Sequence, residues 1–264
     1  MNKIILLLFT TLLICSCSEE ESNKDYGLLK KVESYSNGQI WLAKEVNYTQ
    51  DSQVAKMTIT TETFSTNIYD LNYENREAIS LNLNIDYYQP TNEDELIVYN
   101  ISYVNSDITL TQTNSESRRK IAIQHTDGFI DSYKRFYGEN DEYYIEEIFT
   151  RNSSNDIESI SVYNTNESGA DIFVWKYTFL DFEENVNLAS VYNPIFELSN
   201  IDLINILNLK ISSKNPTKSS RLTGNQNFDE NYRVFEFDSN DNGFVEKGIL
   251  NTLSNSYEYS FKYY

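Results

Sequence analysis

Apolar and polar residues alternate along most of this chain, as they do in β-strands that have one buried face and one wet face. The clearest example lies at 232–247. There apolar residues alternate with polar ones, a polar run ends in Asn242 and Gly243, and a second apolar segment starts at Phe244. This pattern predicts a β-hairpin with a tight polar turn.

Weaker versions of the same pattern recur through the chain. They predict strands at 28–35, 39–48, 54–64, 67–73, 78–88, 95–104, 108–113, 118–125, 129–137, 143–150, 157–163 and 172–182, and a last set of hairpins at 221–264. Asn37 with Gly38 and Asp127 with Gly128 are typical hairpin turns. No linker interrupts 27–264, so we expect one all-β domain. Its antiparallel up-and-down meander would form one curved sheet, either open or closed into a barrel.

One segment departs from the strand pattern. Ser199 and Asp202 have the spacing of a helix N-cap and its third helical position, and apolar residues then follow at helical intervals. We predict a short helix at 200–208 that packs on the sheet by its apolar side. Lys214, Asn215 and Pro216 then end this excursion.

The first residues have the organisation of a secretory signal. Lys3 precedes an apolar run at 4–14, which is too short to span a bilayer as a permanent helix. Ile14, Cys15, Ser16 and Cys17 resemble a bacterial lipobox. That resemblance implies cleavage after residue 16, lipidation of Cys17 and an acidic tether at 17–26. The alternative is an ordinary signal peptide that happens to contain cysteines.

An acidic cluster follows Cys17 at once. Ser18, Glu19, Glu20 and Glu21 resemble the export signal of Bacteroidota lipoproteins that reach the exterior face of the outer membrane. This resemblance implies an outer membrane lipoprotein that faces the cell exterior and contacts the membrane through its lipid. The alternatives are a periplasmic orientation and an acidic tether that carries no signal.

Composition and charge narrow the classes of partner. Both cysteines lie in the signal region, so a chain lipidated at Cys17 has no disulfide and depends on its core. Removing 1–16 removes Lys3 from 21 basic residues and leaves 20 against 40 acidic residues. Such a charge repels phosphate backbones, so nucleic acid is not expected as a partner.

The turn motifs carry a family resemblance. The stretch 232–245, the related turn at 126–130 and the link 213–216 resemble an uncharacterised Bacteroidota lipoprotein domain family described as porin-like, with hairpins in the style of tyrosine-aspartate repeats. The resemblance implies an antiparallel β fold at the cell surface. It brings no catalytic residue with it.

The turn at 238–243 has the spacing of the first half of a calcium loop. Asp238, Asn240 and Asn242 alternate, and Gly243 permits a bend. The twelfth position is Ile249 where a calcium loop has glutamate, and flanking helices are not predicted. A polar hairpin turn is therefore the favoured interpretation, with calcium as the alternative.

Catalytic chemistry has little support in the sequence. His125 is the single histidine, so zinc sites rich in histidine are excluded and any Ser-His triad would have to use it. The adjacent carboxylates of Glu146 and Glu147, and of Asp229 and Glu230, could serve glycoside cleavage, but neighbours on a strand point to opposite faces. We expect no enzyme activity and no cofactor.

Aromatic residues are the strongest candidates for ligand contact, because rings offer a large contact area at a small entropy cost. The candidates for stacking on a sugar or a protein are Tyr133, Tyr137, Tyr143 and Tyr144. Trp175, Tyr177 and Phe179 share one face of a strand, which favours core packing.

Three functions remain open at this stage. The leading hypothesis is a non-catalytic surface module that binds a glycan or an envelope protein. The alternatives are a lipid carrier with an apolar concave face and a carboxylate hydrolase. A membrane-spanning barrel is disfavoured, because the faces that would meet lipid carry too many charges.

Overall fold

The computed structural model describes residues 28–89, 92–115, 119–137, 141–165, 169–183, 195–196 and 201–264. The predicted signal peptide, the lipidation site Cys17, the export signal at 18–21 and the predicted N-cap Ser199 lie outside these residues. These four predictions therefore stay predictions.

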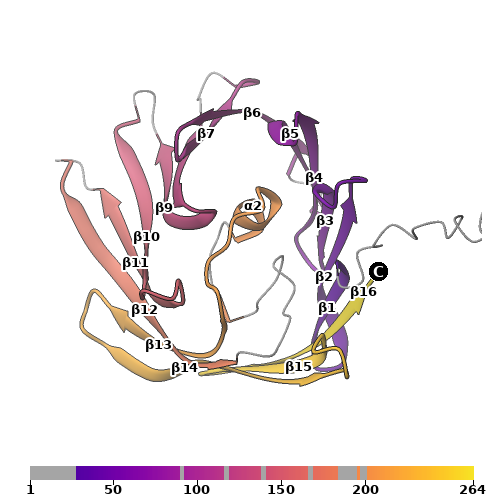
Figure 1. The fold of residues 1–264 in the computed structure, drawn as a ribbon, viewed down its shortest axis with the longest axis vertical. Helices are drawn as coiled ribbons and strands as arrows, with labels where there is room; N and C mark the ends of the chain where they lie inside the picture. The colour runs from indigo at the N-terminus through magenta and orange to yellow at the C-terminus, as the bar shows by residue number, and fades with distance from the viewer. Residues whose placement is uncertain are drawn as a thin grey trace, which may run out of the picture.

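The described residues form sixteen antiparallel strands that close into an up-and-down barrel (Figure 1). The strands are β1 (Leu29–Ser36), β2 (Gln39–Tyr48), β3 (Val54–Thr61), β4 (Ser65–Glu74), β5 (Glu77–Tyr87), β6 (Glu95–Val104), β7 (Asp107–Gln112), β8 (Lys120–Thr126), β9 (Phe129–Tyr137), β10 (Tyr143–Arg151), β11 (Ile157–Thr165), β12 (Asp171–Glu183), β13 (Asn215–Thr223), β14 (Phe228–Ser239), β15 (Val245–Thr252) and β16 (Ser256–Tyr263). This confirms the all-β meander, and the sheet is closed.

The first and last strands close the barrel. Val32 of β1 pairs with Phe261 of β16, and both side chains are buried. The backbone N–H of Tyr264 donates to the carbonyl of Leu28 at 3.1 Å. The described N-terminus and the C-terminus therefore lie at the same end of the barrel, which we call the proximal end. Because neighbouring strands are antiparallel, the turns at 37–38, 62–64, 224–227 and 253–255 lie at the opposite, distal end.

The hairpin turns use left-handed backbone, as the sequence predicts. Asn37 and Gly38 have φ of 52° and 78° between β1 and β2, and Asp127 and Gly128 have φ of 52° and 79° between β8 and β9. Such angles suit a type I′ turn, whose twist matches that of the flanking strands.

Gly38 allows a test of this turn chemistry, because a Cβ added there would meet no atom within 4 Å. We expect Gly38→Ala to lower the free energy of unfolding by about 1 kcal/mol, purely through the left-handed conformation. Gly38→Asn should cost less, since asparagine tolerates this region. Urea unfolding measures both values. Equal losses for alanine and asparagine would contradict this account.

A short helix lies inside the barrel. The helix α2 (Ile201–Ile206) is enclosed by the ring of strands in Figure 1, and it confirms the predicted helix in a shorter form. Five apolar side chains of the helix and of the chain that follows it are buried: Leu203, Ile204, Ile206, Leu209 and Ile211. They fill the proximal half of the lumen as part of one hydrophobic core with the strands.

Backbone hydrogen bonds fix the chain that follows α2 to the proximal turns. The N–H of Lys210 donates to the carbonyl of Gly128 at 2.8 Å, and the N–H of Ile130 donates to the carbonyl of Lys210 at 2.9 Å. Further along, the N–H of Ser213 donates to the carbonyl of Asn155 at 2.9 Å. We call residues 201–213 the plug.

The strand that leaves the plug corrects the sequence interpretation. β13 begins at Asn215 and includes Pro216, whereas the sequence pattern places the last hairpins at 221–264. Pro216 pairs with Phe182 near the start of the strand, where a missing N–H is tolerated. The middle of β13 contains the buried serines Ser219 and Ser220, so this strand lacks the alternation of apolar side chains that marks the others.

The outer face of the barrel carries charged pairs between directly opposed residues. These cross-strand ion pairs are Lys31 with Glu45 at 3.0 Å, Lys56 with Asp70 at 3.6 Å and Lys134 with Glu146 at 3.3 Å. Charges that face each other on a wet sheet surface stabilise it modestly. Among the described residues, no helix is long and apolar enough to cross a membrane.

Candidate functional site

The ion pair between Lys44 and Asp202 identifies the lumen face of the sheet. Lys44 of β2 is buried and contacts Asp202 of α2, which lies inside the barrel. Residues that pair directly across two antiparallel strands point to the same face. The register can therefore be followed around the barrel from Lys44, and every strand presents one set of side chains to the lumen.

Three of the four candidate aromatic residues lie on this lumen face. Tyr143 of β10 pairs with Tyr137 of β9, and Tyr133 lies four residues further along β9 toward the proximal end. Tyr137 and Tyr143 remain 37% and 40% exposed, whereas Tyr133 is only 1% exposed. The three tyrosines thus mark two depths of one wall.

Tyr144 is the exception and lies on the outer face, because it follows Tyr143 directly on a strand. Its ring lies 5.9 Å from that of Phe136, its hydroxyl donates to Asp171 at 2.6 Å, and Lys134 lies over its ring at 4.1 Å. The structure therefore separates Tyr144 from the other three candidates.

A second aromatic group lines the lumen on strands β12 to β14. Tyr177 stacks on Tyr232 with a centroid distance of 5.7 Å, and the Arg221 guanidinium lies over the Tyr232 ring at 4.0 Å. Arg221 also donates to Asp229 at 3.1 Å. Residues far apart in sequence thus build a wall of rings that a guanidinium and a carboxylate hold in place.

Trp175 partly corrects the prediction of core packing on β12. Tyr177 and Phe179 are buried, as the shared face predicts, but Trp175 stays 36% exposed. It lies nearest to the distal end, where the plug does not reach it, and its ring centroid is 6.5 Å from that of Tyr177. Trp175 therefore joins Tyr137 and Tyr143 as an accessible ring of the lumen.

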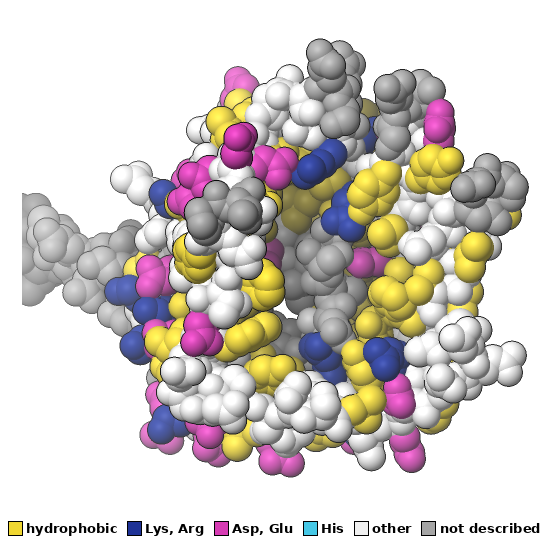
Figure 2. All heavy atoms as spheres, turned by 180° about the vertical axis from the view of Figure 1, so that it is seen from behind, with side chains coloured by type: hydrophobic (Ala, Val, Ile, Leu, Met, Phe, Trp, Pro, Cys, Tyr) yellow, Lys and Arg dark blue, Asp and Glu magenta, His cyan; other side chains and the backbone are white. Residues whose placement is uncertain are grey.

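Figure 2 views the barrel from one end, where hydrophobic side chains and Lys or Arg side chains lie around its centre. The lumen face in its distal half combines aromatic rings with ionisable groups from distant strands, among them Arg135 of β9 and Arg221 of β13. The sequence analysis missed both arginines, because an isolated arginine within a strand gives no signal of which way it points.

The adjacent carboxylates Glu146 and Glu147 point to opposite faces, as expected for neighbours on a strand. Glu146 pairs with Lys134 on the outer face. Glu147 is buried in the lumen wall, and this burial raises the pKa of its carboxyl to about 7, although Arg135 acts in the opposite direction. Burial also raises the pKa of Tyr133, which pairs with Glu147 across the two strands.

The calcium candidates take part in turn and surface contacts. The Asn240 side-chain oxygen accepts from the backbone N–H groups of Asn242 and Phe244, at 3.0 and 3.1 Å. Asp238 pairs with Lys247 across β14 and β15. Among the described residues, no group of three or more His, Cys, Asp or Glu side chains is placed to hold a metal ion.

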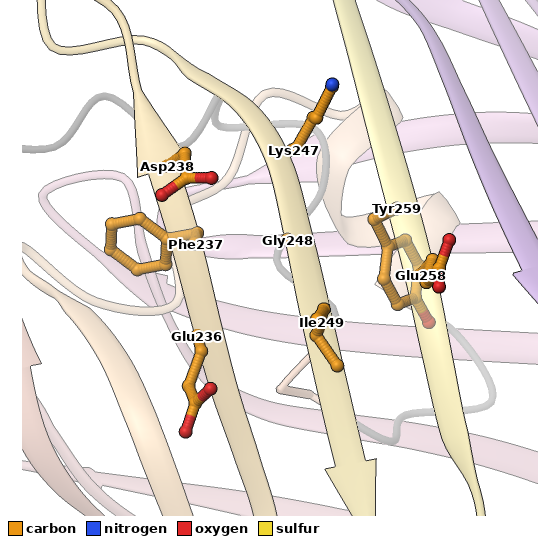
Figure 3. Close-up of a pocket in the computed structure, with 8 residues that line it drawn as sticks. All are labelled: Glu236, Phe237, Asp238, Lys247, Gly248, Ile249, Glu258 and Tyr259. Atoms are coloured by element: carbon orange, nitrogen blue, oxygen red, sulfur yellow. The ribbon is translucent and has the colours of Figure 1, made fainter.

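A hollow of about 340 Å³ lies over strands β14, β15 and β16 (Figure 3). It is lined by Glu236, Phe237, Asp238, Lys247, Gly248, Ile249, Glu258 and Tyr259. The charged lining side chains lie on the outer face, whereas Gly248 lies on the lumen face beside Phe235. A Cβ at this position would come within 2.4 Å of the Phe235 ring, so the glycine makes room for a buried ring.

Comparisons with known proteins match this chain to solved structures only. No protein-family model matches the chain, and no curated protein matches it. Among solved structures, a porin-like protein from Bacteroides vulgatus ATCC 8482 has a TM-score of 0.48 at 9% identity, covering 90% of this chain and 99% of that one. A porin-like protein from Bacteroides uniformis ATCC 8492 has a TM-score of 0.43 at 10% identity, covering 90% and 98%. Both proteins are described as porin-like.

Proposed function

We propose that this protein is a non-catalytic binding protein of the bacterial cell envelope, which holds a glycan in the distal half of its lumen. One observation carries the proposal. Trp175, Tyr137 and Tyr143 keep exposed rings on the lumen face, from strands on two parts of the wall. Rings with one free face stack well on the apolar faces of sugars, while nearby polar groups bind hydroxyls.

The distribution of polarity along the lumen favours a glycan over a lipid. A lipid carrier needs an unfilled apolar surface, but the apolar proximal half is already covered by buried plug residues such as Leu203 and Ile206. The distal half carries Arg135, Glu147 and Arg221 on its lumen face. Lipid tails offer no hydrogen bond to the buried Nε of Arg135 or Oε2 of Glu147, and burying a polar group without a hydrogen bond costs free energy.

The outer face supports a tethered barrel that does not span the membrane. Cross-strand ion pairs occupy positions where a spanning barrel needs an apolar band. The described chain begins at the proximal end, beside the C-terminus. A lipid on Cys17 would therefore attach the barrel by its proximal end and leave the distal end accessible to ligands.

The location has its own test. A tag after Tyr264 should be accessible to antibody on intact cells if the 18–21 signal directs the protein to the exterior. Exchanging Glu19, Glu20 and Glu21 for alanine should reduce this labelling at unchanged total protein. Labelling that requires permeabilised cells in both strains would instead favour the periplasmic alternative.

A glycan array with the soluble 18–264 fragment tests the binding function. This fragment contains β1 and β16, so it can close the barrel. We expect Trp175→Ala to weaken glycan binding about tenfold, because one of the three accessible rings is lost. Tyr144→Ala is the matched control on the outer face and should bind as the parent does. The absence of any glycan ligand, or an equal loss in both variants, would count against the proposal.

A further inference from the structure

The lumen wall formed by β9 and β10 changes character in steps from the distal end inward. Tyr137 and Tyr143 form the accessible row, and Arg135 opposite Ile145 forms the next. Tyr133 opposite Glu147 forms the third row and is buried. Four residues of strand separate Tyr143 from Glu147, or about 13 Å. A ligand that stacks on Tyr137 and Tyr143 points toward the two inner rows.

Polar atoms of these two inner rows have unused hydrogen-bonding capacity. Within the described part of the chain, the Nε of Arg135, the hydroxyl of Tyr133 and the Oε2 of Glu147 are buried and have no hydrogen-bond partner. Tyr133 and Glu147 are 1% and 5% exposed. Buried polar groups nearly always have a partner, and an unsatisfied group costs about 1–3 kcal/mol. These three atoms lie on one wall of the lumen, so a single ligand can be their partner.

The chemistry of the three groups restricts that partner. An arginine N–H can only donate, an ionised carboxylate can only accept, and a phenol can do both. A charged ligand would meet either the guanidinium or the carboxylate with the wrong sign. An uncharged hydroxyl can accept from Arg135 or Tyr133 and donate to Glu147, so it satisfies both kinds of group.

We infer that Tyr133, Arg135 and Glu147 form an inner subsite that binds the uncharged, hydroxyl-rich end of the ligand. The inference rests on the proposed function, since it assigns the substrate class of the same lumen site. Arg135 lies over the Tyr137 ring with its guanidinium carbon 5.0 Å from the centroid, so the accessible row positions the inner one.

Calorimetric titration of the soluble protein tests the inference. The probes are uncharged hexasaccharides of glucose, mannose and xylose, and a hexamer of galacturonic acid as the anionic counterpart. We expect an uncharged probe to bind, and Tyr133→Phe and Glu147→Gln each to raise its Kd about tenfold, as expected for a lost hydrogen bond to a buried group. Thermal unfolding and circular dichroism verify that each variant is folded.

Tyr73→Phe is the matched control. Tyr73 lies on the lumen face in the proximal half, and its hydroxyl donates to the carbonyl of Val54 at 2.8 Å, away from the inner subsite. Loss of the Tyr73 hydroxyl should leave the Kd of the uncharged probe unchanged. A second measurement uses carbon-13 carboxyl labelling of glutamate, with the Glu147 signal assigned from its absence in Glu147→Gln. Saturation with the bound hexasaccharide should shift this signal.

The outcomes separate the two proposals. If an uncharged probe binds but Tyr133→Phe and Glu147→Gln bind it as well as the parent, the inner subsite is wrong and the glycan function stands. Binding of the galacturonate hexamer alone would overturn the uncharged class while leaving glycan binding intact. If no probe binds, both proposals fail.

Discussion

Replacing Asp202 by alanine is expected to lower the free energy of unfolding by about 3 kcal/mol. Lys44 is nearly fully buried in the lumen wall, and Asp202 of the plug is its ion-pair partner, partly open to solvent. Removing the carboxylate takes this counter-charge away from a buried ammonium, and breaking a buried ion pair by removing one partner is strongly destabilising. Urea unfolding followed by circular dichroism measures the loss.

The same substitution should loosen the plug before it unfolds the barrel. We expect faster hydrogen exchange at Leu207 and Lys210, whose N–H groups donate to carbonyls of Leu203 and Gly128. The double variant with Lys44→Met and Asp202→Leu is the control, because apolar side chains of similar volume can replace a buried pair at little cost. An Asp202→Ala protein within 0.5 kcal/mol of the parent would show that the pair does not hold the plug.

Glu147→Gln is expected to remove a pH dependence of stability worth about 3 kcal/mol. The pKa of Glu147 is raised from 4.5 to about 7 in the folded protein because the carboxyl is buried. Below a pH of about 4.5 the carboxyl is protonated in both the folded and the unfolded state. Between about 4.5 and 7 the unfolded chain releases this proton while the folded barrel retains it. The free energy of unfolding therefore falls as pH rises from about 4.5 to about 7. Above about 7 this carboxyl causes no further change.

The measurement is the free energy of unfolding of parent and Glu147→Gln at pH values from 4 to 8.5. The difference between them isolates this carboxyl from the other acids, and it should grow as pH rises. Arg135 is the charged group that opposes the shift, and Tyr133 and Tyr99 are titratable groups of the same wall. Arg135→Gln should therefore steepen the fall, whereas Glu258→Gln controls for removing a carboxylate from the outer face. If the free energies of unfolding of parent and Glu147→Gln changed in parallel with pH, this would contradict the burial of the Glu147 carboxyl.

The fold was largely predictable because its signals are local. Alternation along each strand and left-handed turns such as Asn37 with Gly38 depend on residues a few positions apart, and both are as expected. Closure was left open, because the pairing of β1 with β16 joins residues more than 200 positions apart. β13 was placed too late, since its buried serines and Pro216 do not resemble a strand.

The candidate site was predicted only in part, because alternation along a strand is local whereas the choice of the lumen face is not. Alternation alone separates Tyr143 from Tyr144, yet the sequence cannot show which of the two faces becomes the lumen. The plug decides this, because Asp202 contacts Lys44 and identifies the inner face. The roles of Arg135 and Arg221 depend on neighbours contributed by other strands, so they became visible only with the strand register.

The central claim is that ligand enters the distal half of the lumen, and the fluorescence of Trp175 tests it most directly. The chain has two tryptophans, so Trp41→Phe leaves Trp175 as the single reporter on the lumen face. Acrylamide quenching should be strong in the free protein and should fall in a saturable manner as the uncharged hexasaccharide that binds in calorimetry is added. Unchanged quenching of Trp175 at a probe concentration that saturates binding would place the ligand elsewhere and contradict the account.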